Sequence, residues 1–105
     1  VDDIAFAEFW RDNRQSFSPR SQILTKLELR QKGVSSDIIE QVISTISDDH
    51  NAYQAAASYA YRRPLSDYES FHRRLGGYLK RRGFSYGVIK ETSERLWQEI
   101  GDQQR

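Results

Sequence analysis

The hydrophobic and polar positions of this chain follow the period of an α-helix along almost its whole length. Apolar residues recur three or four positions apart, most clearly at Ile39, Val42, Ile43 and Ile46. This spacing places them on one face of a helix, whereas a half-buried strand would need strict alternation. No segment shows such alternation between turn signals. The pattern therefore predicts an all-α protein.

Cap residues and helix stop signals divide the pattern into six helices. The expected starts are Asp2 or Asp3, Ser18 before Pro19, Ser35, Asp48 or Asp49, Ser66 with Glu69 as a capping box, and Ser85. The first, second, fourth and fifth helices are expected to end near Arg14, Lys32, Arg63 and Arg82. The inward faces of the first two helices are predicted to carry Phe6, Phe9, Trp10, Leu24 and Leu27.

The six helices are predicted to form two sets of three, because the sequence repeats after about fifty residues. The segment LRQKGVSSDII (29–39) aligns with LKRRGFSYGVI (79–89). We therefore expect tandem three-helix repeats, one over residues 1–47 and one over residues 48–105. Stacked repeats of this kind predict an elongated and curved molecule, which we expect to be a monomer.

Both copies of the repeated segment contain a glycine that is expected to end a helix in the left-handed conformation. The glycines are Gly33 and Gly83, and each is followed by an apolar residue, Val34 or Phe84. That apolar side chain can pack on the helix that ends and on the helix that begins. These four residues are therefore predicted to be structural joints that fix the angle between two helices.

Charge is unevenly placed along the chain, although the formal net charge is only +1. Residues 62–90 carry 8 basic and 2 acidic groups, while residues 35–61 carry 4 acidic groups and no basic one. The basic residues of the fifth helix and its surroundings predict a partner-binding surface, here called the basic ridge: Arg62, Arg63, Arg73, Arg74, Gly77, Lys80, Arg81, Arg82 and Lys90. A secondary basic surface is predicted in the first repeat at Arg11, Arg14, Arg20, Lys26, Arg30 and Lys32.

The basic ridge has two interpretations, a contact surface for acidic groups or phosphates and an ordinary solvated face. The glycine pair inside the fifth helix bears on this choice, because each interior glycine costs about 0.5–1 kcal/mol relative to alanine. Gly76 lies nearer the apolar side of the helix and is assigned to helix packing. Gly77 lies on the basic side and is assigned to the ridge.

Enzyme chemistry finds little support in this sequence, and neither a metal nor a cofactor is expected. His50 and His72 are solitary, without a second ligand at the spacing that a helical metal site uses. The chain has no cysteine, which excludes disulfides and thiol chemistry and fits a cytoplasmic location. No apolar run reaches the length of a membrane span.

Three segments resemble signature sequences of the RecX family of bacterial recombination regulators. They are DDIAFAEFW (2–10), LELRQKGV (27–34) and RLGGYLKRRGFSYGVI (74–89), in the order that the family shows. The first two resemble the family's middle three-helix repeat, and the third resembles its C-terminal repeat. Family members usually carry a further three-helix repeat ahead of these, so the resemblance implies a fragment or a short member.

The resemblance also implies a function, which composition and spacing do not. RecX proteins bind the helical filament that RecA forms on single-stranded DNA and lie in its groove. They inhibit its ATPase, strand-exchange and co-protease activities. The partner implied for this chain is the RecA filament, with a weak additional contact to single- or double-stranded DNA.

A helix-turn-helix-like DNA-binding module is the alternative hypothesis, because three helices with a short glycine turn also describe that class. The low net charge and the acidic block at residues 35–61 argue against tight binding to DNA alone. Spacing assigns most aromatic residues to the core, at positions 6, 9, 10, 53, 59, 61, 71, 78 and 84. Tyr61 and Tyr86 are the candidates for exposed residues that stack on bases.

Overall fold

Six α-helices and no strand make up the part of the chain that this computed structural model describes, residues 2–17, 19–62 and 67–103. The helices are α1 (Asp3–Phe17), α2 (Gln22–Gln31), α3 (Ser36–Ile43), α4 (Asp48–Ala60), α5 (Tyr68–Arg81) and α6 (Tyr86–Gln103). Within these ranges, no helix is long and apolar enough to cross a membrane.

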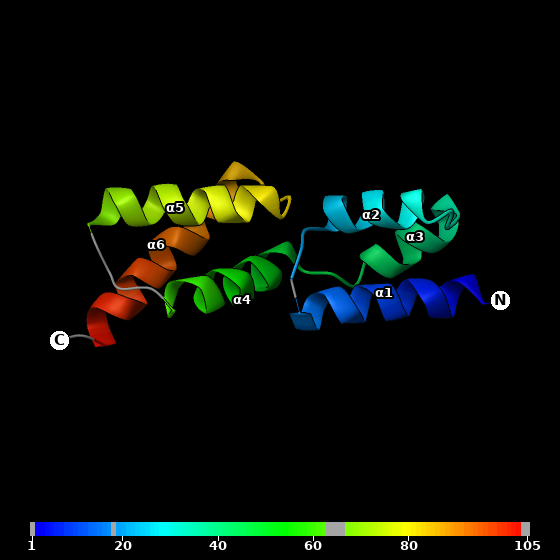
Figure 1. Ribbon diagram of the computed structural model, residues 1–105, viewed down its shortest axis with the longest axis horizontal. Coiled ribbons are helices and arrows are strands. Elements are labelled where there is room, and N and C mark those ends of the chain that lie inside the picture. The colour runs from blue at the N-terminus through cyan, green and yellow to red at the C-terminus, as the bar shows by residue number, and fades with distance from the viewer. Residues whose placement is uncertain (1, 18, 63–66, 104–105) are drawn as a thin grey trace.

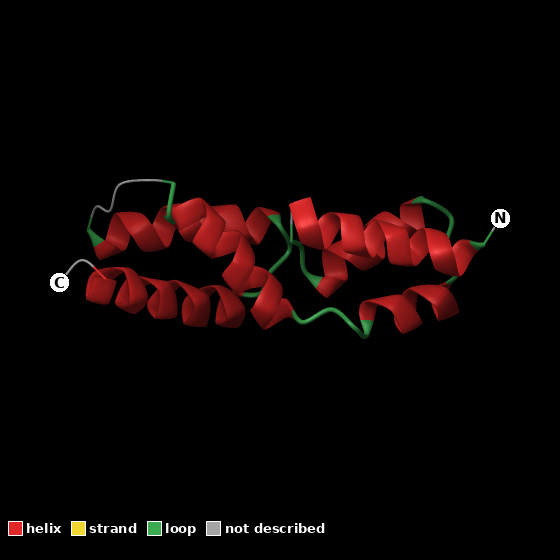
Figure 2. Ribbon diagram, turned by 90° about the horizontal axis from the view of Figure 1, so that it is seen from below, coloured by secondary structure: helices red, strands yellow, loops and turns green. Residues whose placement is uncertain are grey.

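The helices form two three-helix units that lie end to end. Helices α1–α3 make up one half of the molecule and α4–α6 the other (Figure 1). A view from below shows the same two halves, joined by loops near the middle of the long axis (Figure 2). The molecule measures 53 × 20 × 17 Å along its principal axes. The predicted fold, all-α with tandem three-helix repeats and an elongated shape, is confirmed.

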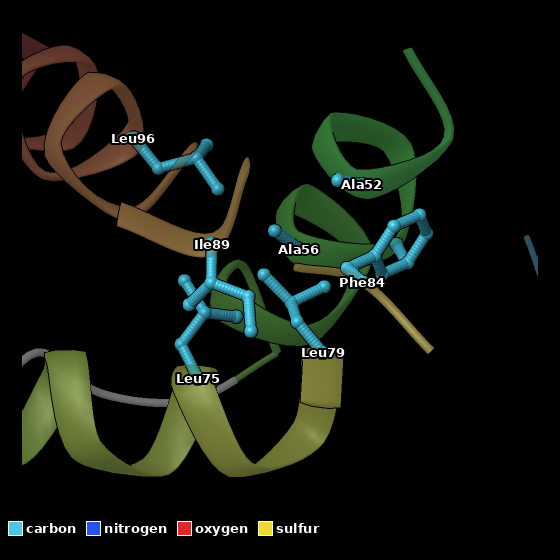
Figure 3. Packing of buried hydrophobic residues seen from close by; sticks show 8 residues of the cluster. Ala52, Ala56, Leu75, Leu79, Phe84, Ile89 and Leu96 are labelled. Carbon is cyan, nitrogen blue, oxygen red and sulfur yellow. The ribbon is translucent and has the colours of Figure 1, made fainter. Parts of the chain in front are cut away.

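Each unit has its own hydrophobic cluster. The cluster of the first unit consists of Ala7, Leu29, Val34, Ile39, Val42, Ile43 and Ile46. The cluster of the second unit consists of Ala52, Ala55, Ala56, Leu75, Leu79, Phe84, Ile89 and Leu96. In Figure 3 the larger side chains from α5 and α6 point toward the alanines of α4. Small residues on α4 therefore leave room for Leu, Ile and Phe side chains to interdigitate against it.

The two glycine joints adopt the predicted conformation. The backbone φ is +85° at Gly33 and +90° at Gly83, and no other described residue has a positive φ. At the first joint, the Gly33 N–H donates to the Arg30 carbonyl (3.1 Å) and the Val34 N–H to the Leu29 carbonyl (3.1 Å). At the second joint, the Gly83 N–H donates to the carbonyl three residues earlier (2.9 Å) and the Phe84 N–H to the carbonyl five residues earlier (3.3 Å). This pair of bonds is a Schellman motif, which satisfies the last carbonyls of α2 and α5. Val34 and Phe84 are buried next to these joints, as predicted.

The start of α2 differs from the prediction. Ser21 caps this helix, rather than the pair Ser18–Pro19, of which Ser18 lies outside the described residues. The Oγ atom of Ser21 accepts from the N–H three residues ahead at 3.1 Å. Two bonds to the second unit complete the cap: the Ser21 N–H donates to the Arg82 carbonyl (3.1 Å) and the Gln22 N–H to Oδ1 of Asp48 (2.9 Å). These partners are distant in the chain, so the local sequence did not indicate the cap.

Other helix boundaries move by smaller amounts. Helix α1 continues to Phe17, beyond the predicted end at Arg14, and α4 ends at Ala60. The N-caps of α4 and α5 are Ser47 and Asp67, each one residue from the predicted start. The predicted cap Ser66 and the predicted end of the fourth helix at Arg63 lie outside the described residues.

Three positions that spacing assigned to the core face solvent instead. Phe9 is 64% exposed, Leu27 47% and Tyr61 53%, whereas Ala7 and Leu29 are fully buried. The buried face of α2 consists of Ser21, Thr25 and Leu29. Two of these three residues are polar, and the Thr25 hydroxyl donates to the Ser21 carbonyl at 3.0 Å. The positions of the large apolar residues therefore indicated the wrong side of this helix.

A buried amide helps to join the two units. Asn51 of α4 is only 1% exposed. Its Nδ2 donates to the carbonyl of Arg20, in the segment before α2, at 3.0 Å. Its Oδ1 accepts from Nε2 of Gln15 at 3.5 Å. Asn51 thus satisfies a backbone group that an apolar side chain would leave without a partner.

Replacing Asn51 by Ala is expected to lower the free energy of unfolding by about 1–3 kcal/mol, because the Arg20 carbonyl would lose its bond from Nδ2. Urea denaturation followed by circular dichroism measures this difference. The matched control is Gln54→Ala, one turn along α4, where the side chain is exposed. Equal stability of the two variants would contradict a role for Asn51 at the junction.

Candidate partner-binding surface

Helix α5 buries one face and exposes a basic one. Leu75 and Leu79 are fully buried in the cluster of the second unit. The exposed cations of this helix are Arg73, Arg74, Lys80 and Arg81. None of these four forms an ion pair with another residue in the described ranges. Arg73 is near enough to Asp67 to contribute to lowering the pKa of that carboxyl, but these four cations have no ion-pair partner in the described ranges, so carboxylate or phosphate groups of a partner could bind them.

The remaining residues of the basic ridge come from other elements and differ in exposure. Arg62 follows α4 and Lys90 lies on α6, and both are exposed. Arg82 is half-buried, and its guanidinium lies 3.8 Å from the centroid of the Tyr78 ring. The Arg82 carbonyl also accepts the N–H of Ser21. Arg82 thus contributes to the joint and the unit junction, and Arg63 lies outside the described residues.

The two adjacent glycines of α5 face different neighbours. A Cβ built at Gly76 would lie 3.7 Å from Cγ2 of Ile89, so this glycine packs against α6 as the sequence indicated. A Cβ built at Gly77 would lie 3.6 Å from Nη1 of Arg81, so the Arg81 guanidinium lies over the bare backbone there. Both distances are ordinary contacts, and neither position requires glycine on steric grounds alone.

Five of the six cations of the secondary basic surface have partners within the first unit. The ion pairs are Arg11 with Asp12 (2.8 Å), Arg20 with Glu28, and Lys26 with Glu40 (2.9 Å). Arg14 and Lys32 lie over the ring of Trp10, 4.3 and 5.0 Å from its centroid. Of the six predicted residues, only Arg30 is both exposed and without an ion pair or ring contact among the described residues.

An open groove along α4 was not foreseen from the sequence. It has a volume of about 930 Å³ and is here called the junction groove, because it begins at the unit junction. Its lining is Gln15, Pro19, His50, Tyr53, Gln54, Ala55, Ala57, Ser58, Arg62 and Tyr78. The signal that could have indicated it is the polar series His50, Gln54 and Ser58, four residues apart in an alanine-rich helix.

A hydrogen-bonded cluster between α4 and α6 lies beside this groove. The Tyr53 hydroxyl donates to Oε2 of Glu99 at 2.5 Å, and Nε of Arg95 donates to Oε1 at 3.0 Å. The bond from Tyr53, followed by that from Arg95, lowers the pKa of Glu99, and the same tyrosine–carboxylate bond raises the pKa of Tyr53. Among the described residues, no group of three His, Asp or Glu side chains could hold a metal ion.

Comparison with known proteins gives consistent matches along this chain. Residues 2–43 match the protein family described as RecX, second three-helix domain. The chain is 36% identical over 93 residues to Regulatory protein RecX of Thermobifida fusca, covering 84% of this chain and 49% of that protein. It is 28% identical over 98 residues to Regulatory protein RecX of Chlorobium phaeobacteroides, covering 92% of this chain and 64% of that protein.

A solved structure supports the fold. The crystal structure of RecX from Lactobacillus salivarius superposes with a TM-score of 0.72, covering 91% of this chain and 64% of that one. At 23% sequence identity this likeness concerns the fold alone. The chain spans between 49% and 64% of the length of these three proteins.

Proposed function

This chain belongs to the RecX family of regulatory proteins, and we propose that it acts by binding the filament of RecA on single-stranded DNA. In this proposal the protein lies in the filament groove and inhibits the recombinase, ATPase and co-protease activities of RecA. It acts through binding and carries out no reaction of its own. Its place is the cytoplasm, where bacterial RecA meets chromosomal DNA.

The observation that carries the proposal is the set of exposed cations on α5 without ion pairs. A surface that only needed to be soluble could pair its cations with acidic neighbours, as the first unit does at Lys26 and Glu40. On α5 the charge is instead concentrated on one side of a helix whose other side is anchored by Leu75 and Leu79. A rigid helix with unpaired cations favours contact with acidic groups of a protein surface.

The shape of the molecule is consistent with this mode of binding. A monomer 53 Å long and 20 Å across can follow a groove between neighbouring filament subunits. The glycine joints and the buried Asn51 hold the helices at set angles, so less conformational freedom is lost on binding.

The exposed cations could also contact the DNA inside the filament. Phosphate groups bind Lys and Arg without regard to sequence, and such contacts weaken steeply with salt. This supports a weak additional contact to single- or double-stranded DNA. A helix-turn-helix-like module remains the alternative, and it predicts that free DNA binds more tightly than the filament.

Reversing three charges of the ridge, with Arg73→Glu, Lys80→Glu and Arg81→Glu together, is expected to weaken filament binding by about tenfold to a hundredfold at low salt. The loss should shrink as salt is raised, because the wild-type attraction is then screened. Binding is measured by fluorescence anisotropy of the labelled protein with the RecA–DNA filament, free RecA and free single-stranded DNA.

The matched controls are the single variants Arg81→Glu and Arg30→Glu, since both side chains are exposed and lie on different units. The first should weaken binding measurably and the second should weaken it less, because Arg30 is a single unpaired cation away from the cluster on α5. Circular dichroism should show unchanged helicity, because none of these side chains is buried. If the triple variant binds the filament as well as the wild type, the basic ridge is a solvated face and the proposal is wrong.

A further inference from the structure

We propose that the junction groove binds an extended segment of the partner protein that carries an acidic side chain. The inference rests on the proposed function, since the partner is the RecA filament. It adds a contact that the sequence did not indicate, on α4 rather than on the exposed side of α5. Of the ridge residues that the structure describes, Arg62 also lines the groove.

The dimensions of the groove suit a short stretch of extended chain. His50 and Arg62 both line the groove and are separated by almost the whole of α4. At the rise of an α-helix this separation is roughly 18 Å. An extended polypeptide covers that length with about five residues. The groove is open along its side, so a chain could enter laterally without its end being threaded in.

The lining favours an extended chain over a helix. The side chains of His50, Gln54 and Ser58 are exposed, and none of them hydrogen-bonds to another described residue. They lie four residues apart and therefore on one side of α4. An extended segment presents unpaired N–H and C=O groups along its length, whereas the backbone of a bound helix is already satisfied. The small Ala57 also lines the groove and would allow a backbone to approach closely.

The charge of the groove favours a carboxylate at one end. Arg62 is exposed and forms no ion pair with the rest of the described chain. A guanidinium can hold a carboxylate through two parallel hydrogen bonds, which fixes the direction of the bound segment. Within the described part of the chain, no acidic residue lines the groove to compete with this contact.

The aromatic residues argue against a nucleic-acid strand as the occupant. Arg95 already lies over the ring of Tyr53 at 4.0 Å, and Arg82 lies over that of Tyr78 at 3.8 Å. Tyr78 also packs against Tyr59, with ring centroids 4.4 Å apart. Bases bind such proteins by stacking on free aromatic faces, and phosphates need several cations. Here the rings of Tyr53 and Tyr78 are engaged, and among the described residues Arg62 is the one Lys or Arg that lines the groove.

The test fills the groove without touching the ridge. Gln54→Trp places an indole in the middle of the groove, and Gln41→Trp is the matched control on the exposed side of α3. Each variant of this chain is titrated with the RecA–DNA filament. Each is also probed with overlapping immobilised peptides that cover RecA, and with oligothymidine.

We expect Gln54→Trp to weaken filament binding by about tenfold, as the loss of a central contact does. Gln41→Trp should bind as the wild type does. One or more acidic peptides should bind the wild type and the control, and should bind Gln54→Trp less. A second variant, Arg62→Glu, should lose the acidic peptides even though it leaves the groove open.

The outcomes separate this inference from the proposed function. If the wild type does not bind the filament, the proposed function fails. If the wild type binds and Gln54→Trp binds equally well, or if no peptide binds, the groove inference alone is overturned. If the wild type binds oligothymidine and Gln54→Trp does not, the groove is assigned to nucleic acid instead. If the wild type forms dimers as its concentration rises and Gln54→Trp does not, the groove is assigned to a second copy of the chain.

Discussion

Replacing Gly83 by Ala is expected to destabilise the protein by about 2–4 kcal/mol, clearly more than the same change at Gly33. Both glycines have positive φ, so an added Cβ is strained at either position. At Gly33 no atom lies within 4 Å of the new Cβ, and the strain of about 1–2 kcal/mol is the whole cost. At Gly83 the Cβ would lie 2.3 Å from Oγ of Ser21 and 2.9 Å from Cβ of Leu24.

Urea denaturation of the two variants measures the difference, with Gly77→Ala as the control for a glycine inside a helix. Gly77→Ala should be neutral or stabilising, because its new Cβ meets only Arg81 at an ordinary distance. In a Ser21→Gly background the cost of Gly83→Ala should fall, since the nearest obstructing atom is gone. Equal costs at Gly33 and Gly83 would show that the close contact between the units does not form in solution.

Replacing Leu79 by Ala is expected to cost about 2–5 kcal/mol of unfolding free energy. Leu79 is fully buried between α4, α5 and α6, in the same cluster as Phe84 and Ile89 (Figure 3). Its removal would leave a cavity beside Phe84, the residue of the second joint that packs on it. The cavity would therefore weaken the packing of both α5, which ends at this joint, and α6, which begins after it.

The matched control is Leu27→Ala, which removes the same atoms from an exposed position. It should cost less than about 1 kcal/mol, because little apolar surface returns to water. Thermal or urea denaturation followed at 222 nm compares the two variants. Similar losses would mean that the burial assigned to Leu79 and Leu27 is wrong.

The sequence shows where basic residues concentrate, but it does not show which of them lack a partner within the protein. The cluster of basic residues in 62–90 is a property of the sequence. Whether each cation has a partner depends on residues brought close by folding. Lys26 forms an ion pair with Glu40 on a different helix, and Lys32 at the end of α2 lies over the ring of Trp10 on α1. For that reason two basic surfaces of similar composition differ in how many of their cations are paired. The junction groove was not foreseen because its lining comes from both units.

The sequence by itself determined the six helices, the repeat and the two glycine joints. These features depend on contacts within a few residues, such as the Schellman bonds at Gly33 and Gly83. The tertiary structure decided which side of α2 is buried and where that helix starts. Both follow from packing against distant residues: Ser21 lies against Gly83, and Gln22 is held by Asp48. A polar face becomes the buried one when distant groups satisfy it, and periodicity of apolar residues carries no information about such partners.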